Sequence, residues 1–89
     1  MITVALQGAL DLHTKDAALA QLLTAISERH HVEVDMSAVT FIDSTAVSMF
    51  IRVQQLAAGD GLRLRLTKLR PLVDRVLQVT GVHEILTQR

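Results

Sequence analysis

The residues with the clearest chemical potential lie in the segment 39–47, where an apolar run turns into a helical pattern. Asp43, Ser44 and Thr45 place a carboxylate and two hydroxyls side by side at that point. These residue types are preferred at helix N-caps, so capping alone is one interpretation. The functional interpretation is that the Ser44 hydroxyl accepts a phosphoryl group. The resulting dianion would meet free backbone N–H groups and the positive end of a helix dipole.

Other catalytic arrangements are missing from the sequence. The chain has no cysteine, no glycine-rich phosphate loop, and no G-x-S-x-G pattern around Ser44. The histidines are His13, His30, His31 and His83. Adjacent His30 and His31 on an extended chain would point to opposite faces, which disfavours a shared metal ion. The sequence therefore predicts no enzyme activity, no metal and no cofactor.

The segment after Asp43 carries two different faces when about 100° is allowed for each helical residue. An apolar packing face carries Ala46, Met49, Phe50, Val53, Leu56 and Ala57. A second face, without formal charge, carries Val47, Ser48, Ile51 and Gln55 in line with Ser44. Such a face is typical of a docking surface for a partner protein. The alternative is that Val47 and Ile51 lie under a neighbouring loop, and the residues do not decide between the two.

The elements that must position these side chains alternate between strand and helix. Hydrophobic periodicity predicts strands over residues 2–6, 31–36 and 62–67, and helices over about 14–29, 44–58 and 71–80. Residues 37–43 form an apolar connection, and residues 82–86 form a short apolar end. Alternation of this kind implies an α/β fold with a small, largely parallel sheet. Arginines alternate with leucines at Arg63 and Arg65, so helices should pack mainly on one side of that sheet.

Length and composition limit the remaining possibilities. With 89 residues, 49% hydrophobic and 20% charged, the chain fits one globular domain over 1–89 and not a disordered segment. No apolar run is long enough to span a membrane and the N-terminus is not a signal peptide, so we expect a cytoplasmic protein. The second half is basic, but Trp and Tyr are absent, which disfavours direct binding to nucleic acid.

Ordered motifs along almost the whole chain resemble those of the STAS domain of bacterial anti-sigma-factor antagonists. Gly8-Ala9-Leu10-Asp11 followed by Thr14 is similar to the early G-x-L-D-x-x-T pattern. Residues 32–45 resemble the central strand and the D-S-[ST]-G phosphorylation loop. Residues 61–64 and 71–82 resemble the last strand and the P-x-V-x-x-x-L-x-x-T-G-[LV] helix. The resemblance implies a STAS-like domain.

The resemblance also implies a phosphorylation-controlled protein switch. In the family, the unphosphorylated domain binds an anti-sigma factor that is also a serine kinase and so releases the sigma factor. The kinase phosphorylates the serine after the aspartate, here Ser44, and a phosphatase restores it. Asp43 then has a role in partner contact or loop geometry, and Thr45 stands in the second hydroxyl position. Val47, Ser48, Ile51 and Gln55 are the expected partner-contact residues beyond the motif.

Two departures from the family pattern and two rival functions accompany this expectation. Ala46 replaces the motif glycine and adds a methyl at an expected contact point. The chain begins where the family's second strand begins, so we expect an exposed sheet edge that permits self-association. The rivals are a STAS-like accessory subunit of a lipid-transporting ABC system, which binds an ATPase, and a scaffold subunit of a signalling assembly.

Overall fold

The computed structural model describes residues 1–87 and contains a three-stranded sheet with four helices. The elements in chain order are β1 (Ile2–Leu10), α1 (Lys15–Ser27), β2 (Val32–Ile42), α2 (Ser44–Gly59), β3 (Leu64–Thr67), α3 (Pro71–Val79) and α4 (His83–Thr87). The strands lie in the order β1-β2-β3, and both pairings are parallel. The predicted α/β fold with a parallel sheet is therefore confirmed.

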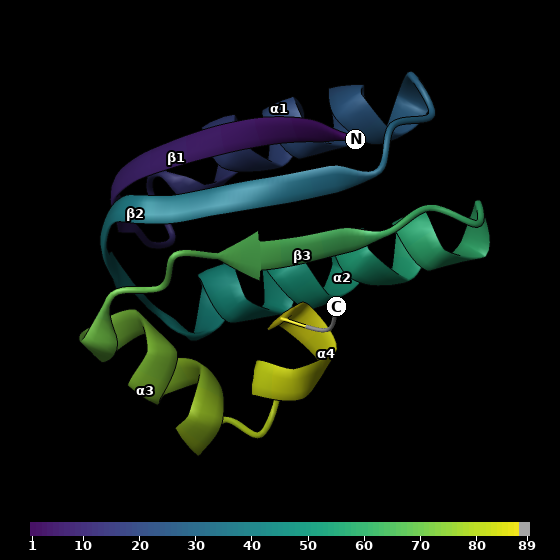
Figure 1. The fold of residues 1–89 in the computed structure, drawn as a ribbon. Coiled ribbons are helices and arrows are strands. Elements are labelled where there is room, and N and C mark those ends of the chain that lie inside the picture. Colours follow the sequence, from purple (N-terminus) through teal and green to yellow (C-terminus); the bar gives the residue numbers. More distant parts are fainter. Residues whose placement is uncertain (88–89) are drawn as a thin grey trace.

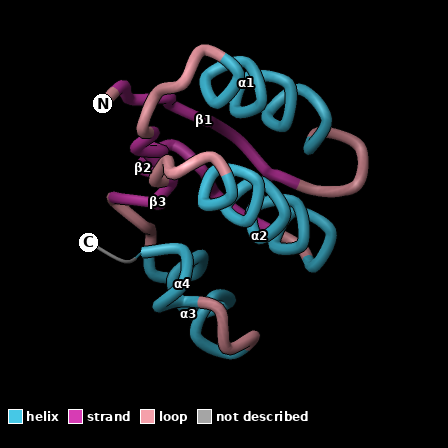
Figure 2. The backbone as a smooth tube through the Cα atoms, turned by 90° about the vertical axis from the view of Figure 1, so that its right-hand side faces the viewer, coloured by secondary structure: helices cyan, strands magenta, loops and turns pink. Residues whose placement is uncertain are grey.

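The helices cover one face of the sheet. In Figure 1, α1 and α2 lie behind the strands, and α3 and α4 lie beyond β3; Figure 2 shows the same layers from the side. Alternate strand side chains such as Leu6, Val34 and Leu66 are buried beneath these helices. Glu33 and Arg65 project from the opposite, partly exposed face. The expectation of helices mainly on one side is confirmed.

The predicted connection over residues 37–43 is wrong, because strand β2 continues through it to Ile42. Its partner β1 also continues past residue 6, as far as Leu10. The pairing passes through two register irregularities, and Gly8 has a φ of 75° beside one of them. An irregularity of this kind inserts a residue and changes which side chains face the core. The buried positions in β2 are thus spaced by two and then by three, which hides the strand from a search for strict alternation.

Residues 83–87 form helix α4, where the sequence indicated only a short apolar segment over 82–86. Gly81 has a φ of 78° and separates α3 from α4, with its N–H donating to the Gln78 carbonyl. Leu86 of α4 is fully buried. The turn between α3 and α4 is thereby held against the domain, and it forms one wall of the site described below.

Two further features bear on the sequence predictions. Among residues 1–87, β1 and β3 each pair only with β2, so each presents one free strand edge. Self-association through such an edge stays a prediction. No helix of the described chain has the length and apolar character needed to cross a membrane.

Candidate functional site

The N-cap of α2 is Asp43, one of the residues whose type suited this role in the sequence. Its Oδ1 accepts hydrogen bonds from the Ala46 N–H at 2.9 Å and from the Thr45 hydroxyl at 2.6 Å. Thr45 is half-buried and its hydroxyl is engaged in this way. Ser44 becomes the first residue of the helix, and its hydroxyl is not needed for capping.

The Asp43 carboxylate also holds the loop that follows β1. Its Oδ2 accepts a hydrogen bond from the Leu12 N–H at 3.2 Å, and the Asp43 N–H donates to the Leu10 carbonyl. Hydrogen bonds from Thr45, Ala46 and Leu12 favour the charged form and hold the pKa of the Asp43 carboxyl below its ordinary value. Leu12 was absent from the residues predicted for this site, because it lies 31 positions away and only the β1–β2 pairing brings it close.

Ser44 is exposed at the start of α2. Within residues 1–87, its hydroxyl has no hydrogen-bond partner, in contrast to that of Thr45. A phosphoryl group on Ser44 would stand at the positive end of the α2 dipole and next to the Asp43 carboxylate. Of the two hydroxyls that follow Asp43, the one on Ser44 is thus exposed and the one on Thr45 is engaged.

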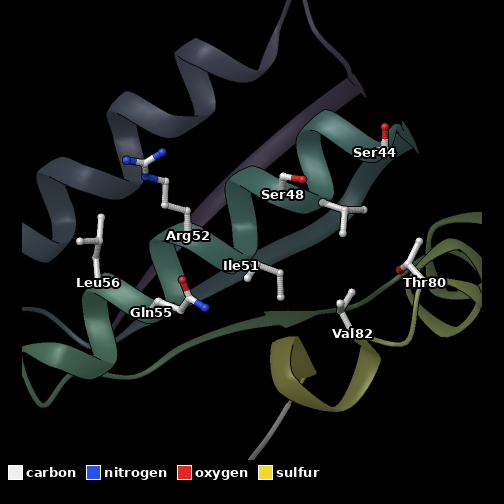
Figure 3. Close-up of a pocket in the computed structure, with 9 residues that line it drawn as sticks. Ser44, Ser48, Ile51, Arg52, Gln55, Leu56, Thr80 and Val82 are labelled. Atoms are coloured by element: carbon white, nitrogen blue, oxygen red, sulfur yellow. The ribbon is translucent and has the colours of Figure 1, made fainter.

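A hollow of about 810 Å³ runs along α2 from Ser44. The five predicted residues Ser44, Val47, Ser48, Ile51 and Gln55 all line it. Four more lining residues were not among the predicted contacts, namely Arg52, Leu56, Thr80 and Val82. We call the hollow lined by these nine residues the α2 groove. Figure 3 shows Thr80 and Val82 on the wall opposite α2, in the segment that joins α3 to α4.

The exposure of the predicted strip is uneven. Ser48 and Gln55 are exposed, Ile51 is half-buried, and Val47 is only 7% exposed. The prediction of one exposed strip is therefore wrong for Val47, which belongs to the buried core. Of the two interpretations left open by the sequence, burial applies to Val47, whereas docking of a partner protein on this face stays a prediction.

The helical wheel also misplaced Leu56. The sequence assigned it to the packing face of α2, but the side chain is 49% exposed and lines the groove. Ala46, on the same predicted packing face, is fully buried. Its methyl group therefore lies in the core and not at the surface contact point expected for it, so the exchange of glycine for alanine leaves the outer face of α2 unchanged.

A second, smaller hollow of about 370 Å³ adjoins the groove on the side of α1. Lys15 and Leu19 of α1 line it together with Ser44, Ser48 and Arg52 and two further residues of α2. Lys15 pairs with Asp16 at 3.0 Å, whereas Arg52 has no ion pair within the described residues. The predicted face without formal charge is thus bordered by a cation, which the sequence analysis missed because Arg52 lies on the wheel between the two faces.

The described chain shows no group of three or more His, Asp or Glu side chains placed to hold a metal ion. His30 lies 3.7 Å from Glu28, and His31 accepts a hydrogen bond through Nδ1 from the Arg63 N–H at 3.0 Å. His83 of α4 pairs with Asp74 of α3. His31 and His83 thus connect neighbouring segments of the fold, whereas the His30 contact lies within the connection from α1 to β2.

Comparison with known proteins gives consistent matches. A family model described as "Mlab, STAS domain" matches residues 1–87. The chain is 27% identical over 88 residues to the anti-sigma F factor antagonist of Paenibacillus polymyxa, covering 97% of this chain and 75% of that protein. It is also 27% identical over 85 residues to a STAS-domain containing protein of Pseudomonas aeruginosa, covering 94% of this chain and 83% of that protein.

Solved structures show the same fold. The unphosphorylated form of the anti-sigma factor antagonist SpoIIAA matches with a TM-score of 0.68 and 23% identity, over 85% of this chain and 71% of that one. Its phosphorylated form gives a TM-score of 0.69 at 23% identity, over 90% and 74% of the two chains. A sulfate transporter family protein from Wolinella succinogenes gives a TM-score of 0.80 at 22% identity, over 97% and 70% of the two chains.

Proposed function

The chain belongs to the STAS domain family, and from this premise we propose that it is an anti-sigma-factor antagonist controlled by phosphorylation at Ser44. In its unphosphorylated form it binds an anti-sigma factor that is also a serine kinase, and the sigma factor is released. A phosphatase reverses the modification. The chain acts by binding and not as an enzyme. The similarity to a curated anti-sigma F factor antagonist supports this choice within the family.

The observation that carries the proposal is the division of roles between Asp43 and Ser44. Asp43 caps α2 and binds the Thr45 hydroxyl and the Leu12 N–H, so both of its oxygens are engaged. Ser44 then presents a hydroxyl that is exposed and, within residues 1–87, without a partner at the end of the α2 groove. A residue needed only for capping would have its oxygen occupied by a backbone N–H.

Phosphorylation changes the charge at one end of the groove. The Ser44 oxygen forms a bond to the γ-phosphorus of ATP, the bond to the ADP oxygen breaks, and the hydroxyl proton passes to a base on the kinase. The product adds a charge of about −1.5 to −2 next to Asp43. A partner that docks against α2 must then desolvate two neighbouring anions, so the complex dissociates.

The test is phosphorylation by the serine-kinase anti-sigma factor from the same genome, followed by mapping of the modified residue by mass spectrometry. We expect one phosphate on wild type and none on Ser44→Ala. Ser48→Ala is the matched control, because Ser48 is exposed one turn further along α2, and it should be modified normally. Phosphate that persists in Ser44→Ala, on Thr45 or Ser48, would refute the assignment. Ser44→Asp should weaken binding, though less than phosphate does.

A second candidate is the accessory subunit of a lipid-transporting ABC system, which binds an ATPase instead of a kinase. The observation that favours it is the family match, since the matching model is described by the name Mlab and not as an anti-sigma factor antagonist. Affinity measurements with the kinase and with an ABC ATPase from the same genome separate the two. Measurable affinity for the ATPase and none for the kinase would support the second candidate.

A further inference from the structure

The α2 groove has a shape and charge that select a particular kind of partner segment. We infer that it receives an amphipathic α-helix whose aliphatic stripe enters between Ile51 and Val82 and whose flanking acidic side chain pairs with Arg52. This inference rests on the proposed function, because it describes the partner surface of the same switch. It adds the secondary structure, the charge and the seat of the partner segment.

The floor and walls of the groove fit aliphatic side chains. Ile51 and Val82 are half-buried, and Figure 3 shows them from opposite sides of the hollow, with Leu56 further along α2. Leu56 is 49% exposed, so it retains apolar surface that a partner can bury. From Ser44 to Leu56 the helix rises about 18 Å, which matches about three turns of a second helix laid alongside.

A helix suits this groove better than an extended peptide. The walls of the groove are side chains of α2 and of the segment joining α3 to α4, and the α2 backbone is hydrogen-bonded within its own helix. An extended peptide would place its own N–H and C=O groups over Ile51 and Val82 without partners, which is costly. A helix satisfies its backbone internally and offers one apolar stripe, as helix-in-groove complexes do.

The charge of the groove selects an acidic segment. Arg52 is the one formally charged residue that lines it, and no carboxylate within residues 1–87 pairs with this guanidinium. Among the described residues, no acidic side chain lines the hollow beside it either, and Lys15, which does line it, is already paired with Asp16. Asp43 lines neither hollow, and its oxygens already accept three hydrogen bonds. A Glu or Asp on the incoming helix would therefore meet a positive rim.

This arrangement also explains how Ser44 controls the groove. Ser44 and Arg52 are eight residues apart on α2, about 12 Å along the axis, and Figure 3 shows the Arg52 side chain extending away from Ser44 toward α1. A phosphate on Ser44 is thus not neutralised by Arg52. The phosphate places negative charge at one end of the α2 groove. Because the partner helix is itself acidic, like-charge repulsion opposes its binding.

The experiment uses three stapled helical peptides with the same aliphatic stripe at i, i+4 and i+7, flanked by Glu, Lys or Gln. Their Kd values are measured by fluorescence anisotropy, and their seat is mapped by NMR on the ¹⁵N-labelled full chain. We expect the Glu peptide to bind about tenfold more tightly than the Lys peptide. The largest shifts should fall on Ser48, Ile51 and Val82.

Two arginine variants test whether Arg52 causes the preference for the Glu peptide. Arg52→Glu should reverse the preference so that the Lys peptide binds more tightly, whereas Arg75→Glu, an exposed arginine of α3 outside the groove, should leave the order unchanged. Thermal melts of both variants confirm that the fold is intact. Affinity that ignores peptide charge, shifts on another face, or no binding of any peptide at millimolar concentration would overturn the inference.

Two controls distinguish this inference from self-association of the chain and from the proposed phosphorylation of Ser44. Shifts at Ser48 and Val82 that grow with protein concentration in the absence of peptide would mean that a second copy of the chain fills the groove, which would overturn an acidic helix as the occupant. The peptide measurements contain no kinase and no ATP. A failure here therefore leaves the Ser44 labelling result standing, and a failure of Ser44 labelling leaves the peptide preference standing.

Discussion

The helix-free face of the sheet and the α2 groove are both polar, but only the sheet face neutralises its own charges. On the sheet face, Arg65 of β3 donates to Glu33 of β2 at 3.1 Å, and Lys68 lies 3.7 Å from Asp35. The Asp35 carboxylate also accepts from the Ser37 N–H at 2.9 Å. These ion pairs connect β2 to β3 and to the residues just after it, although the Arg65 Nε is buried without a hydrogen-bond partner within residues 1–87.

In the α2 groove, the Thr80 hydroxyl donates to carbonyls of α3, but three polar groups on α2 itself have no partner within the described chain. Within residues 1–87, neither Arg52 nor the hydroxyls of Ser44 and Ser48 form a hydrogen bond or ion pair. These groups are therefore available to a partner of the kind proposed above. The comparison teaches that the number of polar side chains does not distinguish a binding surface. What distinguishes it is polar groups that the fold leaves unused beside apolar surface.

The largest expected effect contrasts burial in the two regions. Val47→Lys should lower the free energy of unfolding by about 3 kcal/mol, because it places a charge at a position that is only 7% exposed. Thr3→Lys on the open sheet face should change it by less than about 0.5 kcal/mol. Thr3 lies opposite Glu33 in the β1–β2 register, so the new charge has a partner. Urea denaturation followed by circular dichroism measures both; equal losses would contradict the assignment of the two faces.

A pH-dependent effect compares the two carboxylates whose pKa is lowered. The pKa of Asp43 is held down chiefly by the Thr45 hydroxyl, and that of Asp35 chiefly by the Ser37 N–H. A lowered folded-state pKa stabilises the fold fully above the ordinary value of about 3.9, and this contribution is lost as the pH falls through the folded pKa. The stability of wild type should therefore decline in acid, and Asp43→Asn and Asp35→Asn should each reduce that decline.

Asp43→Asn and Asp35→Asn should change hydrogen exchange in different parts of the chain, and only the first should change partner binding. Asp43→Asn weakens the link to Leu12, so hydrogen exchange should accelerate at the Leu12 amide and partner binding should weaken. Asp35→Asn should change exchange only near Ser37 and leave binding unaltered. Equal effects on binding would show that the sheet face also takes part in the interface.

The smallest expected effect tests the difference between paired and unpaired arginines. Arg65→Gln should lower the free energy of unfolding by about 0.5 kcal/mol, because it breaks a partly exposed ion pair with Glu33. Arg52→Gln should leave stability unchanged, since no carboxylate of the described chain contacts it. Thermal melts at low and at high salt measure the difference, which should shrink as salt screens the Arg65 pair. A larger loss for Arg52→Gln would indicate a structural role for that residue.

Sequence periodicity and residue chemistry were sufficient for the class of fold and for the key segment. The alternation of apolar strands with helical patterns predicted the parallel α/β arrangement, because both signals depend only on local spacing. The preference of Asp, Ser and Thr for helix starts located the beginning of α2, since capping is a local interaction. The motif that carries Ser44 was readable for the same reason.

Only the tertiary structure decided which groups are free and which are covered. The irregular β1–β2 pairing extends β2 through residues that look like a connection, and it brings Leu12 to Asp43. The segment joining α3 to α4 lines the hollow opposite α2 and so turns one face of that helix into a groove, in which Val47 is buried. Helical spacing places side chains around an axis but carries no information about which distant segment packs against them. Exposure is therefore fixed by contacts between residues far apart in the chain.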